Sequence, residues 1–95
     1  MHKYVYPAVF TQESVGGYSI SFPDVSGCFT QGENIVDGMY MAADALSLML
    51  NNISYEDFPV PSDIRFIDYD KKTQFVSYVY CELPERSDGG DADDE

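Results

Sequence analysis

Alternating apolar and polar side chains over the first third of the chain predict β-strands that each bury one face. In residues 3–10 the even-numbered side chains are aromatic or small and apolar, and they share one face because successive strand residues point to opposite sides. Pro7, on the other face, has no N–H for a ladder hydrogen bond and therefore indicates an edge or a bulge. Residues 18–22 alternate in the same way, and residues 28–31 predict a short third strand.

A glycine turn and one helix complete the pattern of the first half. Residues 13–17 end in two glycines, which adopt positive φ at little cost and suit a turn between strands. Asn34 is a good N-cap and Asp37 mimics a capping box, so a helix is predicted over residues 35–52. Gly38 in that helix costs roughly 1 kcal/mol relative to Ala, and either permits close approach to the sheet or is tolerated. The apolar residues of this segment form one stripe: Met39, Ala42, Ala43, Leu46, Met49, Leu50 and Ile53.

The second half of the chain is less regular. Residues 55–62 contain two prolines and are predicted to be an extended connection. Residues 63–70 are ambiguous and could form a strand that ends at a turn over residues 70–73. Residues 75–82 give the clearest late strand, apolar on both faces and therefore predicted to be central. The predicted fold class is α+β: a small, mostly antiparallel sheet of three N-terminal strands and one or two returning strands, with one helix.

The net charge of this single small domain indicates which class of partner it could bind. The 95 residues carry 17 acids and 5 bases, a net charge of −12. Residues 85–95 are acidic and lack large apolar side chains, so they are predicted to be a disordered tail. The predicted domain, residues 1–84, still holds 11 acids against 4 bases. Phosphate contacts need clustered Lys and Arg, so this balance argues against direct nucleic-acid binding and favours a basic protein partner, or simply solubility.

Two cysteines and one histidine, Cys28, Cys81 and His2, are too few and too separated to predict a metal site. No metal or other cofactor is therefore expected, and both thiols are expected to be reduced and buried as small apolar side chains. No basic and apolar leader is visible, and no apolar run approaches the ~20 residues that a membrane span requires. We therefore expect a cytoplasmic protein without membrane contact.

No catalytic residue stands out, and three residues are candidates for partner binding: Asp24, Tyr78 and Tyr80. Asp24 follows a proline in a turn, where its carboxylate either meets a basic partner or accepts hydrogen bonds from nearby backbone. Tyr78 and Tyr80 share one face of the late strand. One helix covers only one sheet face, so these tyrosines either form an interface or are solvent-tolerant strand residues.

The segment YSISFPDVSGCFTQG, residues 18–32, closely resembles the signature of the HicB family, the antitoxin halves of HicA/HicB toxin–antitoxin pairs. The resemblance also includes YPAVFT at residues 6–11 and Gly-Gly-Tyr at residues 16–18. It implies a sheet like that of a trimmed ribonuclease H. It also implies a partner, because members of this family bind HicA, a small basic ribonuclease toxin, and block its access to messenger RNA. The acidity of the chain suits such a partner.

The resemblance leaves other functions open. Many family members carry a DNA-binding module after this domain, whereas residues 85–95 are acidic here, so operator binding by this chain alone is not expected. An oligomeric adaptor of the same fold would bind another protein through its tyrosines. A residual metal-dependent nuclease would need converging carboxylates, but Asp24 lies in a turn and Asp37 and Asp44 lie on the outer face of the helix. Small size and excess aromatic strand surface predict a homo-oligomer, either a dimer or a tetramer.

Overall fold

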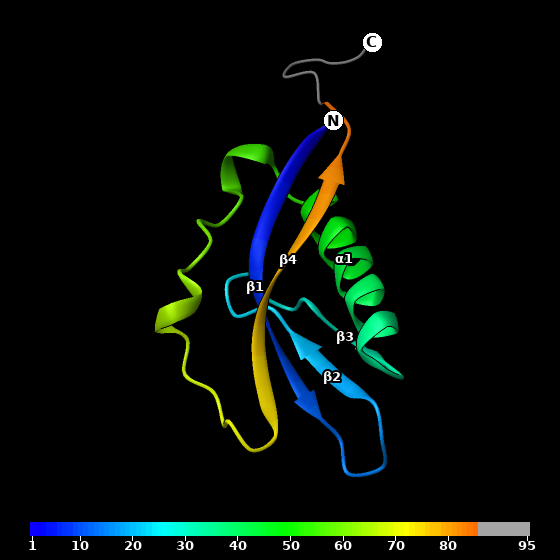
Figure 1. Ribbon diagram of the computed structural model, residues 1–95. Coiled ribbons are helices and arrows are strands. Elements are labelled where there is room, and N and C mark those ends of the chain that lie inside the picture. The colour runs from blue at the N-terminus through cyan, green and yellow to red at the C-terminus, as the bar shows by residue number, and fades with distance from the viewer. Residues whose placement is uncertain (86–95) are drawn as a thin grey trace.

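The computed structural model describes residues 1–85, and the predicted disorder of the tail beyond residue 85 lies outside them. A four-stranded antiparallel sheet, in the order β3-β2-β1-β4, is covered on one face by helix α1 (Figure 1). This is the predicted α+β class, and a single strand returns to the sheet within the described residues. The elements are β1 (His2–Gln12), β2 (Tyr18–Ser21), β3 (Phe29–Gly32), α1 (Ile35–Asn51), two 3-10 turns, η1 (Tyr55–Asp57) and η2 (Ile64–Phe66), and β4 (Gln74–Leu83).

The predicted glycine turn joins β1 and β2 into a hairpin. The Glu13 N–H donates to the Gly17 carbonyl at 3.0 Å, and Gly16 and Gly17 have φ angles of +99° and +82°. A Cβ on Gly17 would also lie 2.8 Å from the carbonyl oxygen of Gly32 in β3. Gly17 is therefore needed both for its backbone conformation and for the space beside β3.

The helix begins at the predicted cap. The Asn34 side chain accepts a hydrogen bond from the Asp37 N–H at 2.8 Å, and the Asp37 carboxylate accepts from the Glu33 N–H at 2.9 Å. Asp37 thus reaches back as Glu does in a capping box, but its carboxylate accepts from Glu33, the residue before the N-cap. The helix ends at Asn51, one residue before the predicted end, with Asn52 as its C-cap. Every residue of the predicted apolar stripe belongs to the buried core or packs against it.

Two glycines let α1 lie close to the sheet. A Cβ on Gly38 would lie 3.3 Å from the Ile20 Cδ1 and 3.5 Å from the Phe10 Cε2. A Cβ on Gly32 would lie 2.5 Å from the Cα of Gly38, a distance that real structures do not contain. Gly38 therefore permits close helix–sheet approach, which was one of its two predicted roles. Beneath this contact Phe10 is fully buried and stacks on Phe75, with ring centroids 4.7 Å apart.

Pro7 lies in the interior strand β1, at a position where the strand edge that faces β2 has no pairing partner. The Gln12 N–H donates to the Thr73 carbonyl at 2.7 Å. Backbone groups alternate in direction along a strand, so the even-numbered residues of β1 face β4 and Pro7 faces the other way. On that other side β2 pairs with β1 only from Val9 to Gln12. The missing N–H of Pro7 thus costs no ladder hydrogen bond. The predicted edge exists only around Pro7, where β2 does not extend far enough to pair with β1.

The prediction that the late strand is central was wrong, because β4 lies at the edge of the sheet beside β1. Its odd-numbered side chains face α1, where Val79 and Cys81 are buried. Its even-numbered side chains include Tyr78 and Tyr80 and face the opposite side. Apolar character on both faces normally indicates coverage by two layers. Here the second face is only partly covered, by the connection between α1 and β4 (Figure 1).

That connection also differs from its prediction. The extended segment predicted over residues 55–62 contains the turn η1, and residues 63–70 form the turn η2 instead of a strand. In η2 the Asp63 carboxylate accepts a hydrogen bond from the Arg65 N–H at 2.9 Å, a local bond that competes with pairing in a sheet. The predicted turn before β4 is confirmed, since the Asp70 carbonyl accepts from Thr73 and Gln74 N–H groups at 3.1 and 2.7 Å.

Candidate functional site

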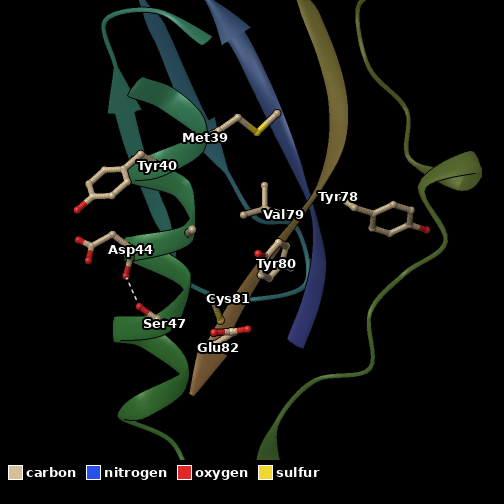
Figure 2. A pocket seen from close by; sticks show the side chains of 10 residues that line it. Met39, Tyr40, Asp44, Ser47, Tyr78, Val79, Tyr80, Cys81 and Glu82 are labelled. Atoms are coloured by element: carbon tan, nitrogen blue, oxygen red, sulfur yellow. Dashed lines mark hydrogen bonds between the residues drawn. The ribbon is translucent and has the colours of Figure 1, made fainter. Parts of the chain in front are cut away.

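A groove of about 550 Å³ runs between α1 and the edge strand β4 (Figure 2). Tyr40, Asp44 and Ser47 reach it from α1 because their spacing of four and three residues places them on one helix face. The Ser47 hydroxyl donates to the Asp44 backbone carbonyl at 2.9 Å and so stays close to the helix. The full lining is Met39, Tyr40, Ala43, Asp44, Ser47, Tyr78, Val79, Tyr80, Cys81 and Glu82.

Next to the groove, α1 presents a line of exposed side chains at intervals of four residues, which we call the outer stripe: Val36, Tyr40, Asp44 and Leu48. Val36 is 83% exposed, Tyr40 74% and Leu48 58%. Single exposed apolar residues are ordinary, but three on one helix face beside a groove, with Asp44 between Tyr40 and Leu48, favour a protein-binding surface. From the sequence, this helix face was expected only to be the outer face that carries Asp37 and Asp44. The four-residue spacing of its apolar members was the signal that could have identified it.

The groove and the outer stripe carry negative charge. Asp44 and Glu82 are the charged residues of the groove, and α1 contains neither Lys nor Arg. The nearest ion pair joins Glu82 to Lys3, with 3.8 Å between Nζ and Oε2, and both side chains are exposed. Exposed pairs of this kind contribute little to stability. Lys3 offsets part of the charge of Glu82, and Asp44 supplies the remaining negative charge of the groove. The surface therefore combines aromatic and apolar area with an acidic potential.

Asp24, a predicted candidate for partner binding, holds two distant segments of this chain together. Its carboxylate accepts hydrogen bonds from the Ser62 N–H at 2.7 Å and from the Ser62 hydroxyl at 2.6 Å. It thus ties the turn between β2 and β3 to the connection before β4. Nearby backbone was the expected structural partner of Asp24, whereas the actual partner is 38 residues away in the chain. No local pattern could indicate that partner.

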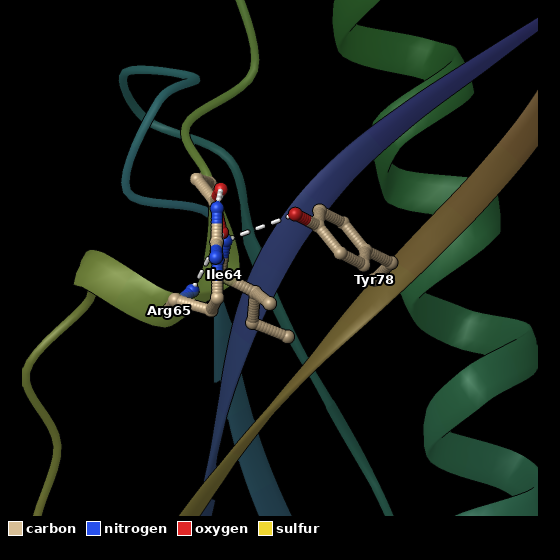
Figure 3. Close-up of polar contacts among 4 residues, drawn as sticks. Ile64, Arg65 and Tyr78 are labelled. Carbon is tan, nitrogen blue, oxygen red and sulfur yellow. Dashed lines mark hydrogen bonds and ion pairs between the residues drawn. The ribbon is translucent and has the colours of Figure 1, made fainter.

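Tyr78 and Tyr80, the other two candidates, are used differently although they share a sheet face. The Tyr78 hydroxyl accepts a hydrogen bond from the Ile64 N–H at 2.9 Å and so attaches η2 to β4 (Figure 3). Beside it the Arg65 guanidinium holds the pKa of the Asp63 carboxyl below its usual range through hydrogen bonds. Tyr80 is 59% exposed and lines the groove. Of the three candidates, Tyr80 has the side chain most open to a partner.

The two cysteines are unpaired and buried, as predicted for structural thiols. Burial, with a smaller effect from Cys81, raises the pKa of the Cys28 thiol to about 11, and burial also raises the pKa of Cys81. Burial likewise raises the pKa of Tyr6, with a further increase from the negative charge of Asp24. The Tyr6 hydroxyl donates to the Pro59 carbonyl at 2.6 Å. These groups stay neutral at physiological pH, so the thiols are poor nucleophiles.

The carboxylates considered for a nuclease do not converge. Asp24 is bound to Ser62, Asp37 caps α1, and Asp44 lies in the outer stripe. Among residues 1–85 no group of three or more His, Cys, Asp and Glu side chains is arranged to hold a metal ion. Within the same residues no helix is both long enough and apolar enough to cross a membrane.

Comparison with known proteins identifies the family. Residues 6–82 match the model of the HicB_like antitoxin of bacterial toxin-antitoxin systems. Antitoxin HicB of Escherichia coli (strain K12) is 37% identical over 67 residues, which cover 67% of this chain and 48% of that protein. The chain therefore spans about half the length of the curated relative it matches.

Solved structures agree with the sequence match. A chain of a toxin–antitoxin complex from Streptococcus pneumoniae superposes with a TM-score of 0.75 and 25% identity, covering 85% of this chain and 70% of that one. A chain of the HicA3 and HicB3 toxin–antitoxin complex superposes with a TM-score of 0.65 and 28% identity, covering 84% of this chain and all of that one. By the match over residues 6–82, this chain belongs to the HicB-like antitoxin family.

Proposed function

We propose that this chain is an antitoxin that binds a small, basic, mRNA-cleaving toxin of the HicA type and neutralises it by protein–protein contact. The family match over residues 6–82 supports this role. The HicA3 and HicB3 complex, whose fold this chain shares, supports a toxin of that type as the partner. The target of such a toxin is messenger RNA, so the proposed site of action of the pair is the cytoplasm.

The acidic groove with its outer stripe is the observation that carries the proposal. A toxin that binds RNA needs a basic surface, and the same surface is attracted to Asp44 and Glu82. Tyr40 and Tyr80 supply rigid aromatic area, the kind of side chain that is enriched where protein interfaces bind most strongly. Neutralisation follows from occupancy: a toxin surface that is covered by the antitoxin cannot accept RNA. The chain needs no catalytic group and no cofactor for this function.

Charge reversal in the groove provides the test. Asp44→Lys, alone and with Glu82→Lys, should reduce recovery of a co-expressed HicA-type toxin and restore its toxicity. Asp68→Lys is the matched control, because Asp68 is exposed in the connection before β4 and outside the groove. Equal loss from all three variants would indicate a general charge effect, and undiminished capture by the groove variants would place the toxin elsewhere.

An oligomeric adaptor that binds a different protein is the second candidate, because Tyr40 and Tyr80 would suit many partners. Co-expression with a small basic protein encoded next to this chain separates the two functions. Relief of that protein's toxicity supports the antitoxin, while its binding without any effect on RNA cleavage supports the adaptor. We do not expect this chain alone to bind operator DNA, since α1 carries no base.

Self-association is also part of the proposal. A domain of this size buries a modest fraction of its surface and gains stability when copies associate. We therefore propose a homo-oligomer built from dimers, as a closed symmetric assembly.

A further inference from the structure

The outer edge of β4 presents backbone groups that no neighbouring strand pairs within residues 1–85. The Gln12 N–H donates to Thr73, so the odd-numbered residues of β4 direct their backbone groups to β1, and the even-numbered ones direct theirs outward. Within residues 1–85 the sheet continues on one side of β4 only. The outward set is Val76, Tyr78, Tyr80 and Glu82, because the N–H of Gln74 already donates to the Asp70 carbonyl. The Tyr78 carbonyl also accepts from the Ser77 hydroxyl at 3.1 Å, which leaves its second lone pair for a partner strand.

This edge has none of the usual protection against strand pairing. Natural edge strands are commonly short, or carry Lys, Pro or a bulge. β4 is ten residues long, contains no Lys or Pro, and pairs with β1 in an uninterrupted register from His2 to Thr11. Its single charged residue is Glu82, in a chain with a net charge of −12. An open edge of this length is therefore a functional surface or an aggregation hazard.

We propose that β4 pairs with β4 of a second copy, antiparallel and about a twofold axis, to give one continuous eight-stranded sheet. This inference rests on the proposed self-association and names its surface. A strand edge is self-complementary under that symmetry, because each outward N–H of one copy meets a carbonyl of the other. Two chains of net charge −12 repel each other, and β4 is a long strand with one charge, so association there meets little repulsion.

The side chains favour a register centred on Val79. It places Tyr78 of one copy opposite Tyr80 of the other, in a hydrogen-bonded pair of outward residues. It also places Glu82 opposite Val76 and away from its own equivalent, so no acid faces an acid across the axis. Aromatic cross-strand pairs stabilise such a ladder, whereas like charges directly opposed would weaken it.

The arrangement leaves the helix side of the toxin surface open, while Tyr80 and Glu82 of the groove also lie in the strand seam. The twofold axis is perpendicular to the sheet, so both copies of α1 lie on the same side of the joined sheet. The outer stripe, on the side of α1 away from the core, stays exposed in each copy. Dimerisation and toxin binding are therefore separable by variants outside the groove, and Val76 is such a position.

Substitutions at Val76 of the full chain test the proposal by sedimentation over a range of concentrations. Val76→Pro removes an outward N–H without affecting the hydrogen bonds between β4 and β1. The dimer contains two copies of this residue, so two hydrogen bonds are lost, and the dimer dissociation constant should rise by about tenfold or more. Val76→Ala, the matched control, should change it far less. Val76→Glu puts an acid opposite Glu82 and should weaken the dimer, whereas Val76→Lys should strengthen it.

Circular dichroism identifies variants that fail to fold, and the Glu and Lys pair tests the proposal even if the proline variant is lost. Toxin capture should persist in all four variants, so its loss in Asp44→Lys alone, which leaves the seam unchanged, would bear on the proposed function and not on this inference. A wild-type chain that stays monomeric, or a dimer indifferent to every Val76 variant, would overturn the proposal. Loss of toxin capture in Val76→Pro, with a monomeric wild-type chain, would assign the edge to the toxin instead.

Discussion

Asp24 and Ser62 are joined by two hydrogen bonds, at 2.7 Å to the serine N–H and 2.6 Å to its hydroxyl, across 38 residues of sequence. The pair fastens the long connection before β4 to the turn between β2 and β3. Because a charged acceptor strengthens hydrogen bonds, this contact is a main determinant of where the connection lies.

Removing the Asp24 carboxylate should therefore destabilise the protein. We expect Asp24→Ala to lower the free energy of unfolding by about 1–3 kcal/mol, measured by urea denaturation. Ser62→Ala should cost less, because the backbone N–H of residue 62 still donates to Asp24. If Asp24→Ala left stability unchanged but abolished toxin capture, Asp24 would be a partner contact and its structural role would be refuted.

The two glycines between β3 and α1 should differ in tolerance. Gly32→Ala would place a Cβ 2.5 Å from the Gly38 Cα, so the helix must move away, and we expect a loss of about 2 kcal/mol or more. In Gly38→Ala the nearest atom is the Ile20 Cδ1 at 3.3 Å, which can shift, and Ala is a better helix former. The net change should be within about 1 kcal/mol. Thermal unfolding of both variants gives the comparison, and equal losses would show that the helix is not held closely.

Burial of Cys28 should make stability depend on alkaline pH. Its pKa is raised from 9.0 to about 11, so the neutral thiol is favoured in the folded state. The stabilising contribution is fully present below pH 9, where both states are protonated. It is lost as pH rises towards 11, because the unfolded state releases its proton first.

Cys28→Ala is the matched variant for this prediction. Urea denaturation at increasing pH should show a shallower decline of stability for the variant than for the wild type. Alkylation of the native thiols near neutral pH should be slow and should accelerate on unfolding. Rapid alkylation of the folded protein would contradict the burial of these side chains.

Substitution of Tyr78 should affect stability, and substitution of Tyr80 should affect toxin binding. Tyr78→Phe leaves the Ile64 N–H without its acceptor and should cost about 0.5–1.5 kcal/mol of stability. Tyr80→Ala should change stability little, because the side chain is largely exposed, but should weaken toxin capture. Denaturation and pull-down measurements on both variants test these two roles. Loss of toxin capture in Tyr78→Phe with loss of stability in Tyr80→Ala would contradict the prediction.

No hydrolysis of RNA or of a hybrid duplex is expected with Mg²⁺ or Mn²⁺. Phosphoryl-transfer sites of that kind use several carboxylates around the metal, and Asp24, Asp37 and Asp44 are held apart in different parts of the fold. Incubation with labelled substrate provides the measurement. Metal-dependent cleavage that disappears in Asp24→Asn would establish a nuclease after all.

Local features of the chain were readable from the sequence because their causes are local. The side-chain period of two identified the N-terminal strands, and the cap at Asn34 with the apolar stripe identified α1 within one residue of its end. The turn at Gly16 and Gly17 followed from backbone conformational freedom. The segment at residues 18–32 pointed to the family, and with it to the kind of partner.

Features that depend on contacts between distant segments were decided only by the tertiary structure. β4 looked central because both its faces are apolar, yet strand order depends on which edges meet, and periodicity carries no information about that. The partner of Asp24, the groove between α1 and β4, and the different uses of Tyr78 and Tyr80 all arise where segments tens of residues apart are brought together. A local pattern shows which side chains share a face, and only packing determines what lies against that face.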